Sequence, residues 1–150
     1  FSTVETKEQC EKIKEFCFHP PVGKRGLGLV RQNMWGESGL VHEDPIIIPQ
    51  IESKTAVDNL NEILNYDFSY YLIGPYDLSL SINLPGKFDN PEFICYIDRI
   101  NSLIPKNKLA IHIPSNVQNE IHKYKNYGIK CLGMDTVAII HYNKEIVKNA

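Results

Sequence analysis

Two acidic residues stand at the ends of apolar stretches of the sequence, where side chains can act on a ligand. Glu52 closes the stretch 45–51, and Asp77 lies two residues past the stretch 70–75. If both stretches are strands of a parallel sheet, their carboxyl ends meet at one edge, about 4.8 Å apart on neighbouring strands. Two carboxylates there could share one cation. Oxygen ligands without His or Cys favour Mg²⁺ or Mn²⁺, and ligand number does not separate these from Co²⁺.

Both carboxylates also have an ordinary structural interpretation. Acidic residues at strand ends often cap the following helix or begin a turn. Glu52 would then be a helix cap, and Asp77 would start a turn after Pro75. Spacing alone leaves both interpretations open.

The elements that would position these residues alternate along the chain. Short apolar stretches predict strands over residues 45–52, 70–75, 109–113 and 130–134. The first is rich in β-branched residues, as in a strand buried on both faces. Apolar residues at helical spacing predict helices over residues 56–64, 90–100, 116–127 and 137–148. A capping box at Thr6 and Gln9 predicts a further helix over 6–17.

Alternation of strand and helix predicts a parallel sheet of right-handed βαβ units. Four such units are half of a (β/α)8 barrel, which normally takes about 250 residues. We therefore expect residues 1–150 to form one α/β domain of the TIM-barrel type, as an incomplete barrel. The alternative is a small doubly wound domain whose open sheet edges are sheltered by loops or by a partner chain.

A glycine-rich segment from Gly23 to Gly39 has no clean period, and we expect a long ordered loop there. Lys24 and Arg25 in this loop could bind a phosphate or a carboxylate; a solvated pair that stabilises the loop is an equally good interpretation. Trp35 is expected to pack the loop rather than bind substrate. No role is assigned to any of the five histidines.

Composition narrows the classes of function. A formal net charge of −2, with both signs interspersed, gives no basic patch for nucleic acid. No apolar run approaches the roughly 18 residues of a membrane span, and the first residues lack a signal-peptide pattern. We expect a cytoplasmic protein that acts on small molecules. The four cysteines form no C-x-x-C pair, which predicts reduced, buried thiols.

Several short motifs recur in a fixed order. They are PPVGKRGLG at 20–28, PQIES and AVDNL within 49–60, IGPYDLS at 73–79, PG and NPE within 85–92, and GMD at 133–135. In order and spacing they resemble the HpcH/HpaI aldolase family over nearly the whole chain. The resemblance implies a (β/α)8 barrel of which this chain covers roughly the last four β/α units.

The resemblance also implies a metal-dependent class II pyruvate aldolase. Such a carbon–carbon lyase cleaves or forms 2-keto-4-hydroxy acids through a pyruvate enolate, so pyruvate and an aldehyde are the expected partners. The family's metal-binding residues correspond to Glu52 and Asp77, and a Gln at the substrate end of the site corresponds to Gln50. The residues that would line the pyruvate pocket are Gly74, Pro75 and Tyr76.

The chain departs from the family pattern in lacking its general-base His and its substrate-orienting Arg, which lie on the early strands of the barrel. Three interpretations follow: a piece of an ordinary aldolase, a natural half-barrel that binds metal and a keto acid or serves in assembly, or a lyase of acyl-CoA esters of the citrate lyase type. The resemblance further implies a homo-oligomer, a trimer or hexamer, in which residues 137–150 pack on a neighbour.

Overall fold

Four parallel strands organise the chain in the computed structural model, which describes residues 1–38, 44–113 and 120–149. The strands are β1 (Gln50–Ile51), β2 (Tyr71–Ile73), β3 (Leu109–Ile113) and β4 (Ile129–Leu132). Each pairs in parallel with the next, so their order in the sheet is their order in the sequence. This arrangement confirms the predicted α/β fold and matches one part of a barrel wall.

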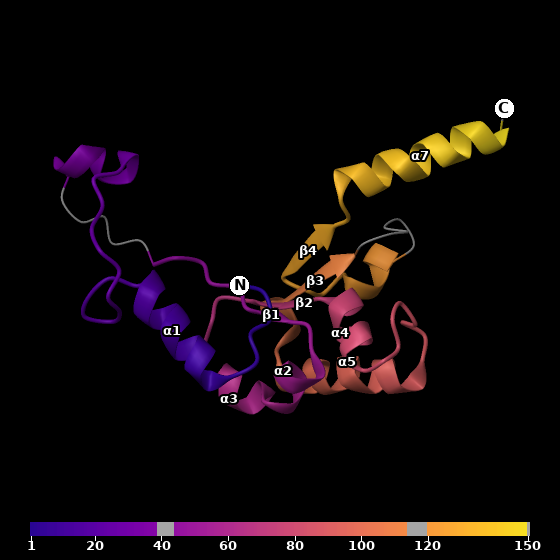
Figure 1. The fold of residues 1–150 in the computed structure, drawn as a ribbon, viewed down its shortest axis with the longest axis horizontal. Coiled ribbons are helices and arrows are strands. Elements are labelled where there is room, and N and C mark those ends of the chain that lie inside the picture. The colour runs from indigo at the N-terminus through magenta and orange to yellow at the C-terminus, as the bar shows by residue number, and fades with distance from the viewer. Residues whose placement is uncertain (39–43, 114–119, 150) are drawn as a thin grey trace.

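Four of the α-helices lie together on one side of this sheet (Figure 1). The α-helices are α1 (Lys7–Cys17), α2 (Lys54–Asp58), α3 (Leu60–Leu64), α4 (Pro75–Ser81), α5 (Pro91–Leu103) and α7 (Asp135–Asn149). Short 3₁₀ helices are η1 (Arg31–Gly36), η2 (Lys106–Lys108) and η3 (Ile121–Tyr124). Figure 1 shows α1, α2, α3 and α5 grouped below the strands, whereas α7 and the segment after α1 extend away in opposite directions.

The hydrophobic core lies between the sheet and these helices. Ile51, Ile73 and Ile111 are register partners on three strands, so their side chains share one face, and all are buried. Helical residues of the core include Ala56, Val57, Leu60, Ile63, Phe93 and Ile100. On the opposite face the partners Gln50 and Leu72 are only half-buried. Gln50 therefore lies on the face of the sheet opposite to this core.

The first strand is shorter and more exposed than predicted. Only Gln50 and Ile51 pair as a strand, and Ile46 is 73% exposed, so the expectation of burial on both faces is wrong for the start of this stretch. Pro49 has no N–H to donate to a ladder, which limits regular pairing on that side. The stretch is nevertheless extended, and the Pro49 carbonyl accepts from the Leu72 N–H at 2.9 Å.

The predicted helices are mostly present, with three corrections. The helix over 56–64 is divided at Asn59 into α2 and α3. The helix α4 begins at Pro75, where no helix is predicted and a turn is the alternative interpretation. Residues 121–124 form a 3₁₀ turn rather than an α-helix, and 116–119 lie outside the described residues. The capping box of α1 and the Asn90 cap of α5 are confirmed, although Ile94 on the predicted stripe is exposed.

The loop after α1 also differs from expectation. Part of it forms η1, and Trp35 is 69% exposed with a left-handed backbone, so it does not pack the loop as predicted. All four cysteines are free thiols, as predicted, but Cys95 is exposed. Burial raises the pKa of the Cys10 thiol to about 11. Within the described part of the chain, none of the helices has the length and apolar character needed to cross a bilayer.

Candidate functional site

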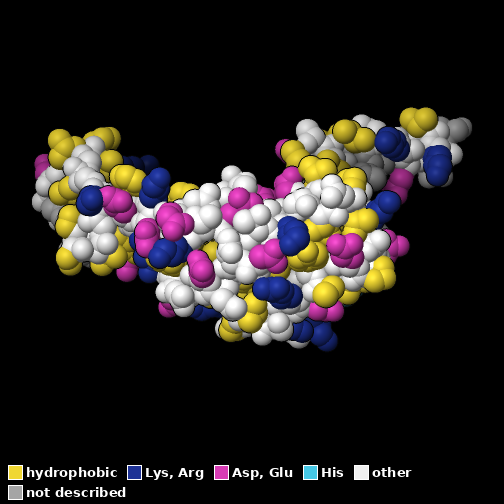
Figure 2. All heavy atoms as spheres, turned by 60° about the horizontal axis from the view of Figure 1, so that its bottom comes forward, with side chains coloured by type: hydrophobic (Ala, Val, Ile, Leu, Met, Phe, Trp, Pro, Cys, Tyr) yellow, Lys and Arg dark blue, Asp and Glu magenta, His cyan; other side chains and the backbone are white. Residues whose placement is uncertain are grey.

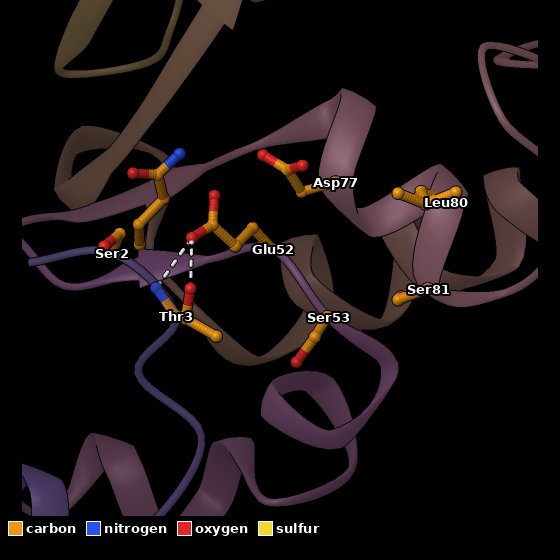
Figure 3. A pocket seen from close by; sticks show the side chains of 8 residues that line it. Ser2, Thr3, Glu52, Ser53, Asp77, Leu80 and Ser81 are labelled. Carbon is orange, nitrogen blue, oxygen red and sulfur yellow. Dashed lines mark hydrogen bonds between the residues drawn. The ribbon is translucent and has the colours of Figure 1, made fainter.

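A cavity of about 530 Å³ opens where β1 and β2 end. Its lining residues are Ser2, Thr3, Gln50, Glu52, Ser53, Asp77, Leu80 and Ser81. They come from the first residues of the chain, from the end of β1 and from α4, and Figure 3 shows them around one space. The carboxyl ends of parallel strands thus meet here, where enzymes of this architecture place their ligands.

Glu52 follows β1 directly and is only 6% exposed. Its Oε1 accepts two hydrogen bonds from Thr3, one from the backbone N–H at 2.6 Å and one from Oγ1 at 3.1 Å. The N-cap of α2 is Ser53, whose Oγ accepts from the Ala56 N–H at 3.1 Å. Glu52 is therefore not the helix cap, and its carboxylate faces the cavity.

Asp77 enters the same cavity from the first turn of α4. Figure 3 shows its carboxylate turned toward the space that the Glu52 carboxylate also faces. The helix α4 begins at Pro75, which suits the first helical position because proline has no N–H to satisfy there. A helix that begins directly after β2 thus carries Asp77 to the end of the strand next to β1.

Gly74 provides the space that Glu52 needs. A Cβ at this position would lie 2.8 Å from both Cβ and Oε2 of Glu52 and 2.9 Å from Nε2 of Gln50. The side chains of Glu52 and Gln50 therefore lie over the backbone of β2, which only a residue without a side chain permits. The sequence predicts that Gly74 lines a pyruvate pocket; the structure places it beneath the two side chains that face the cavity.

The remaining predicted contacts lie outside the cavity lining. Tyr76 is 48% exposed, and its ring meets that of Phe88 edge-on, with 5.0 Å between ring centroids. Pro75 is the first residue of α4. Their assignment to a pyruvate pocket stays a prediction.

Lys24 and Arg25 lie outside the cavity as well. The Lys24 ammonium is paired with Glu15 on α1, and the Arg25 N–H donates to the Phe18 carbonyl at 2.8 Å. These contacts anchor the loop to the end of α1 and agree with the interpretation of a solvated pair. A role in ligand binding stays a prediction.

Hydroxyl groups are the part of the site that sequence reasoning missed. Ser81 Oγ accepts from the Lys54 N–H at 2.8 Å and so ties α4 to α2 beside the cavity. Ser53 caps α2 and donates to Glu5. A Ser after the strand-end Glu is a usable signal for the cap, whereas Thr3 is 49 residues from its partner Glu52 and gives no local signal.

The donor set of the cavity fits a hard divalent cation. The described residues contain no group of three or more His, Cys, Asp or Glu side chains placed to hold a metal, so Glu52 and Asp77 would be the two protein ligands. Mg²⁺ is commonly bound by one or two carboxylates, with water and substrate oxygens at its other positions. Thr3 contacts Glu52 through Oε1, whereas Oε2 lies beside Gly74 at the cavity.

A parallel sheet with acidic side chains at its strand ends is the arrangement of (β/α)8-barrel enzymes. The model of the HpcH/HpaI aldolase/citrate lyase family matches residues 2–141, and the chain belongs to this family. The family resemblance seen in the sequence is thereby confirmed.

Curated relatives and solved structures agree with this assignment. The chain is 38% identical over 96 residues to 2-keto-3-deoxy-L-rhamnonate aldolase of Escherichia coli (strain K12), a match that covers 59% of this chain and 36% of that protein. It is 36% identical over 96 residues to the enzyme of the same name from Shigella boydii serotype 4 (strain Sb227), with the same coverage. The match thus spans about a third of the length of these relatives.

Two solved structures share the fold over nearly the whole chain. The HpcH/HpaI aldolase from Desulfitobacterium hafniense DCB-2 has a TM-score of 0.80 at 17% identity, and the match covers 99% of this chain and 61% of that one. A HpcH/HpaI aldolase/citrate lyase family protein from Burkholderia cenocepacia J2315 has a TM-score of 0.78 at 19% identity, with 99% and 63% covered. At this identity they show the fold: the four-stranded sheet is part of a TIM-barrel-type architecture.

Proposed function

We propose that the chain forms the metal-binding and keto-acid-binding part of an aldolase, a carbon–carbon lyase that cleaves or forms 2-keto-4-hydroxy acids through a pyruvate enolate. The observation that carries this proposal is the pair of carboxylates, Glu52 and Asp77, facing one cavity at the ends of neighbouring strands. The family of aldolases and citrate lyases to which the chain belongs supports the reaction class.

Each cavity residue then has a defined task. Glu52 and Asp77 would hold Mg²⁺ or Mn²⁺, with Co²⁺ as a further candidate. A bound divalent cation supplies positive charge next to a developing enolate oxygen. The Gln50 amide, beside Glu52 in the cavity, would donate to a substrate oxygen and orient it. Gly74 leaves the room that both side chains occupy.

The substrates proposed are pyruvate and a hydroxylated aldehyde, or the 2-keto-3-deoxy acid that they form. The curated relatives are named for 2-keto-3-deoxy-L-rhamnonate. The cavity lining is polar, with hydroxyl, amide and carboxylate groups on Ser2, Gln50, Glu52 and Asp77, and a polar lining suits a hydroxylated substrate. Serine hydroxyls can accept as well as donate hydrogen bonds, which suits a polyhydroxylated chain.

A second candidate function is binding of metal and keto acid without turnover. Among the described residues, those that line the cavity include no His, Lys or Arg, so none is an obvious base or substrate-orienting cation. General acid–base catalysis is worth roughly 10²- to 10⁴-fold in rate. A chain without such a group would bind its ligands and turn them over slowly or not at all.

Retro-aldol cleavage distinguishes the two candidates. The chain with Mn²⁺ and 2-keto-3-deoxy-L-rhamnonate should release pyruvate, followed as NADH oxidation by lactate dehydrogenase, and EDTA should abolish the release. A citryl-CoA ester in place of the keto acid should give no product. Absence of pyruvate release, with Mn²⁺ and pyruvate still bound, would contradict aldolase activity of this chain and support the binding function.

We further propose that the chain assembles with copies of itself. Figure 2 shows hydrophobic side chains gathered at both ends of the molecule, over the segment after α1 and over α7. On α7 the exposed apolar residues are Ile139, Ile140, Tyr142, Ile146 and Val147. Exposed apolar patches of this kind commonly mark protein interfaces.

Sedimentation velocity tests this assembly. We expect a trimer or hexamer for the unsubstituted chain, and a shift toward monomer when Ile140 and Val147 are both replaced by Ser. The same exchange at exposed Ile46, outside α7, is the control and should leave the mass unchanged. A sharp monomer mass for the unsubstituted chain would contradict the proposal.

A further inference from the structure

Thr3 holds an unusual conformation next to the proposed metal ligands. Its φ of 52° lies in the left-handed region, which a β-branched residue rarely adopts. The chain on either side is fixed: the Gln50 N–H donates to the Phe1 carbonyl at 2.8 Å, and Val4 is buried. Backbone strain of this sort persists where surrounding contacts enforce it, and it is often found at functional sites.

In this conformation two hydrogen-bond donors of Thr3 point to one carboxylate oxygen of Glu52. The Thr3 N–H and Oγ1 lie 2.6 and 3.1 Å from Oε1 of Glu52, and both donate to it. A carboxylate oxygen offers about two lone-pair positions, so these two bonds fill the capacity of Oε1. The other oxygen, Oε2, lies over Gly74, where a Cβ would be 2.8 Å away. The two oxygens of Glu52 therefore have different surroundings.

We propose that Thr3 is a positioning residue that makes Glu52 offer a cation one oxygen, Oε2, and thereby selects small divalent cations over Ca²⁺. This inference rests on the proposed function of the site. Mg²⁺ requires near-octahedral geometry and takes carboxylates through single oxygens, whereas Ca²⁺ takes six to eight ligands and often binds a carboxylate through both. Binding through both oxygens of Glu52 would require Oε1 to give up its bonds to Thr3.

The proposal is tested by the ratio of two dissociation constants, for Ca²⁺ and for Mn²⁺, measured by isothermal titration calorimetry. Thr3→Val removes the hydroxyl donor and keeps the shape of the side chain. We expect the Ca²⁺/Mn²⁺ ratio to fall about three- to tenfold, the equilibrium equivalent of one hydrogen bond of ordinary net strength. A ratio is used because general loosening of the site would weaken both ions together.

Three further variants separate loss of the hydroxyl from changes in packing or folding. Thr3→Gly also lacks the hydroxyl but suits a φ of 52°, so it should fold well and show the same fall in the ratio. Thr3→Ser keeps both donors and should retain the ratio of the unsubstituted chain. Thr55→Val removes a hydroxyl from an exposed position on α2 and should also change nothing.

The outcomes separate this inference from the proposed function. Suppose that the unsubstituted chain binds Mn²⁺ and that Thr3→Val and Thr3→Gly keep its Ca²⁺/Mn²⁺ ratio, as the control Thr55→Val does. Thr3 then does not determine selectivity and the inference is wrong, while the metal site stands. If Thr3→Ser loses selectivity as Thr3→Val does, packing rather than the hydroxyl is responsible, which also overturns it. If the unsubstituted chain binds no Mn²⁺, the proposed function fails, and the inference fails with it.

Discussion

Replacing Glu52 by Gln should reduce the affinity of the chain for Mn²⁺ by about 100-fold or more, because a unit charge a few ångströms from a cation is worth several kcal/mol at a partly buried site. Gln has nearly the same shape as Glu, and its carbonyl oxygen can still accept from the Thr3 N–H and Oγ1. The exchange therefore removes charge while keeping the contacts that hold the side chain.

The Asp77→Asn exchange should also lower the affinity for Mn²⁺, since both carboxylates face the cavity. Asp89→Asn is the matched control, because Asp89 is exposed and lies outside the cavity lining. Isothermal titration calorimetry measures all three variants, and urea unfolding checks that each is folded. Binding by Glu52→Gln at the affinity of the unsubstituted chain would contradict the assignment of Glu52 as a ligand.

Gly74→Ala has the second large expected effect. The backbone of Gly74, with φ −99° and ψ 89°, accepts Ala without left-handed strain, so any effect comes from the added Cβ. That atom would lie 2.8 Å from Cβ and Oε2 of Glu52, closer than real Cβ contacts occur. Thr3 holds Glu52 from the other side, so the carboxylate cannot simply turn away.

We expect Gly74→Ala to weaken Mn²⁺ binding by about 10- to 100-fold, as for loss of groups that orient metal ligands. Overpacking should also lower the free energy of unfolding by about 1 to 3 kcal/mol. Gly26→Ala is the control, because a Cβ there meets nothing within 4 Å and the φ is not positive. Unchanged Mn²⁺ affinity in Gly74→Ala would show that the carboxylate does not need the space above β2.

Local signals account for the parts of the fold that the sequence predicts correctly. The strand predicted over 109–113 is five apolar-rich residues long, and β3 has those bounds. The capping box predicts the helix after Thr6, and both hydrogen bonds of that box are present. Such elements depend on residues a few positions apart, so their sequence is sufficient.

The predictions are wrong where tertiary contacts or single turns decide the structure. The stretch before Gln50 is apolar enough for a buried strand, but its regular pairing is limited to two residues and Ile46 faces solvent. The helix α4 stands where no helix is predicted and where a turn is the alternative interpretation, although Pro75 at its first position is a usable signal. The split at Asn59 interrupts a helix whose buried residues keep their helical spacing on both sides.

The candidate site likewise has features that the sequence predicts and features that depend on tertiary contacts. The approach of Glu52 to Asp77 can be predicted because parallel neighbouring strands end at one edge. The partner of Glu52 cannot, since Thr3 is 49 residues away and its left-handed backbone has no local sequence signal. The packing of Tyr76 on Phe88 is also beyond prediction from local sequence, because the contact depends on how the chain returns after α4.

Titration of Mn²⁺ into the unsubstituted chain, with and without pyruvate, decides whether the cavity beside Glu52 and Asp77 binds a metal and a keto acid. We expect one Mn²⁺ per chain, bound more tightly when pyruvate is present, because a keto acid supplies oxygen ligands that two carboxylates leave open. Calorimetry gives both the stoichiometry and the two affinities. An Mn²⁺ affinity that is undetectable, or that pyruvate leaves unchanged, would contradict the assignment of this cavity as a metal and keto-acid site.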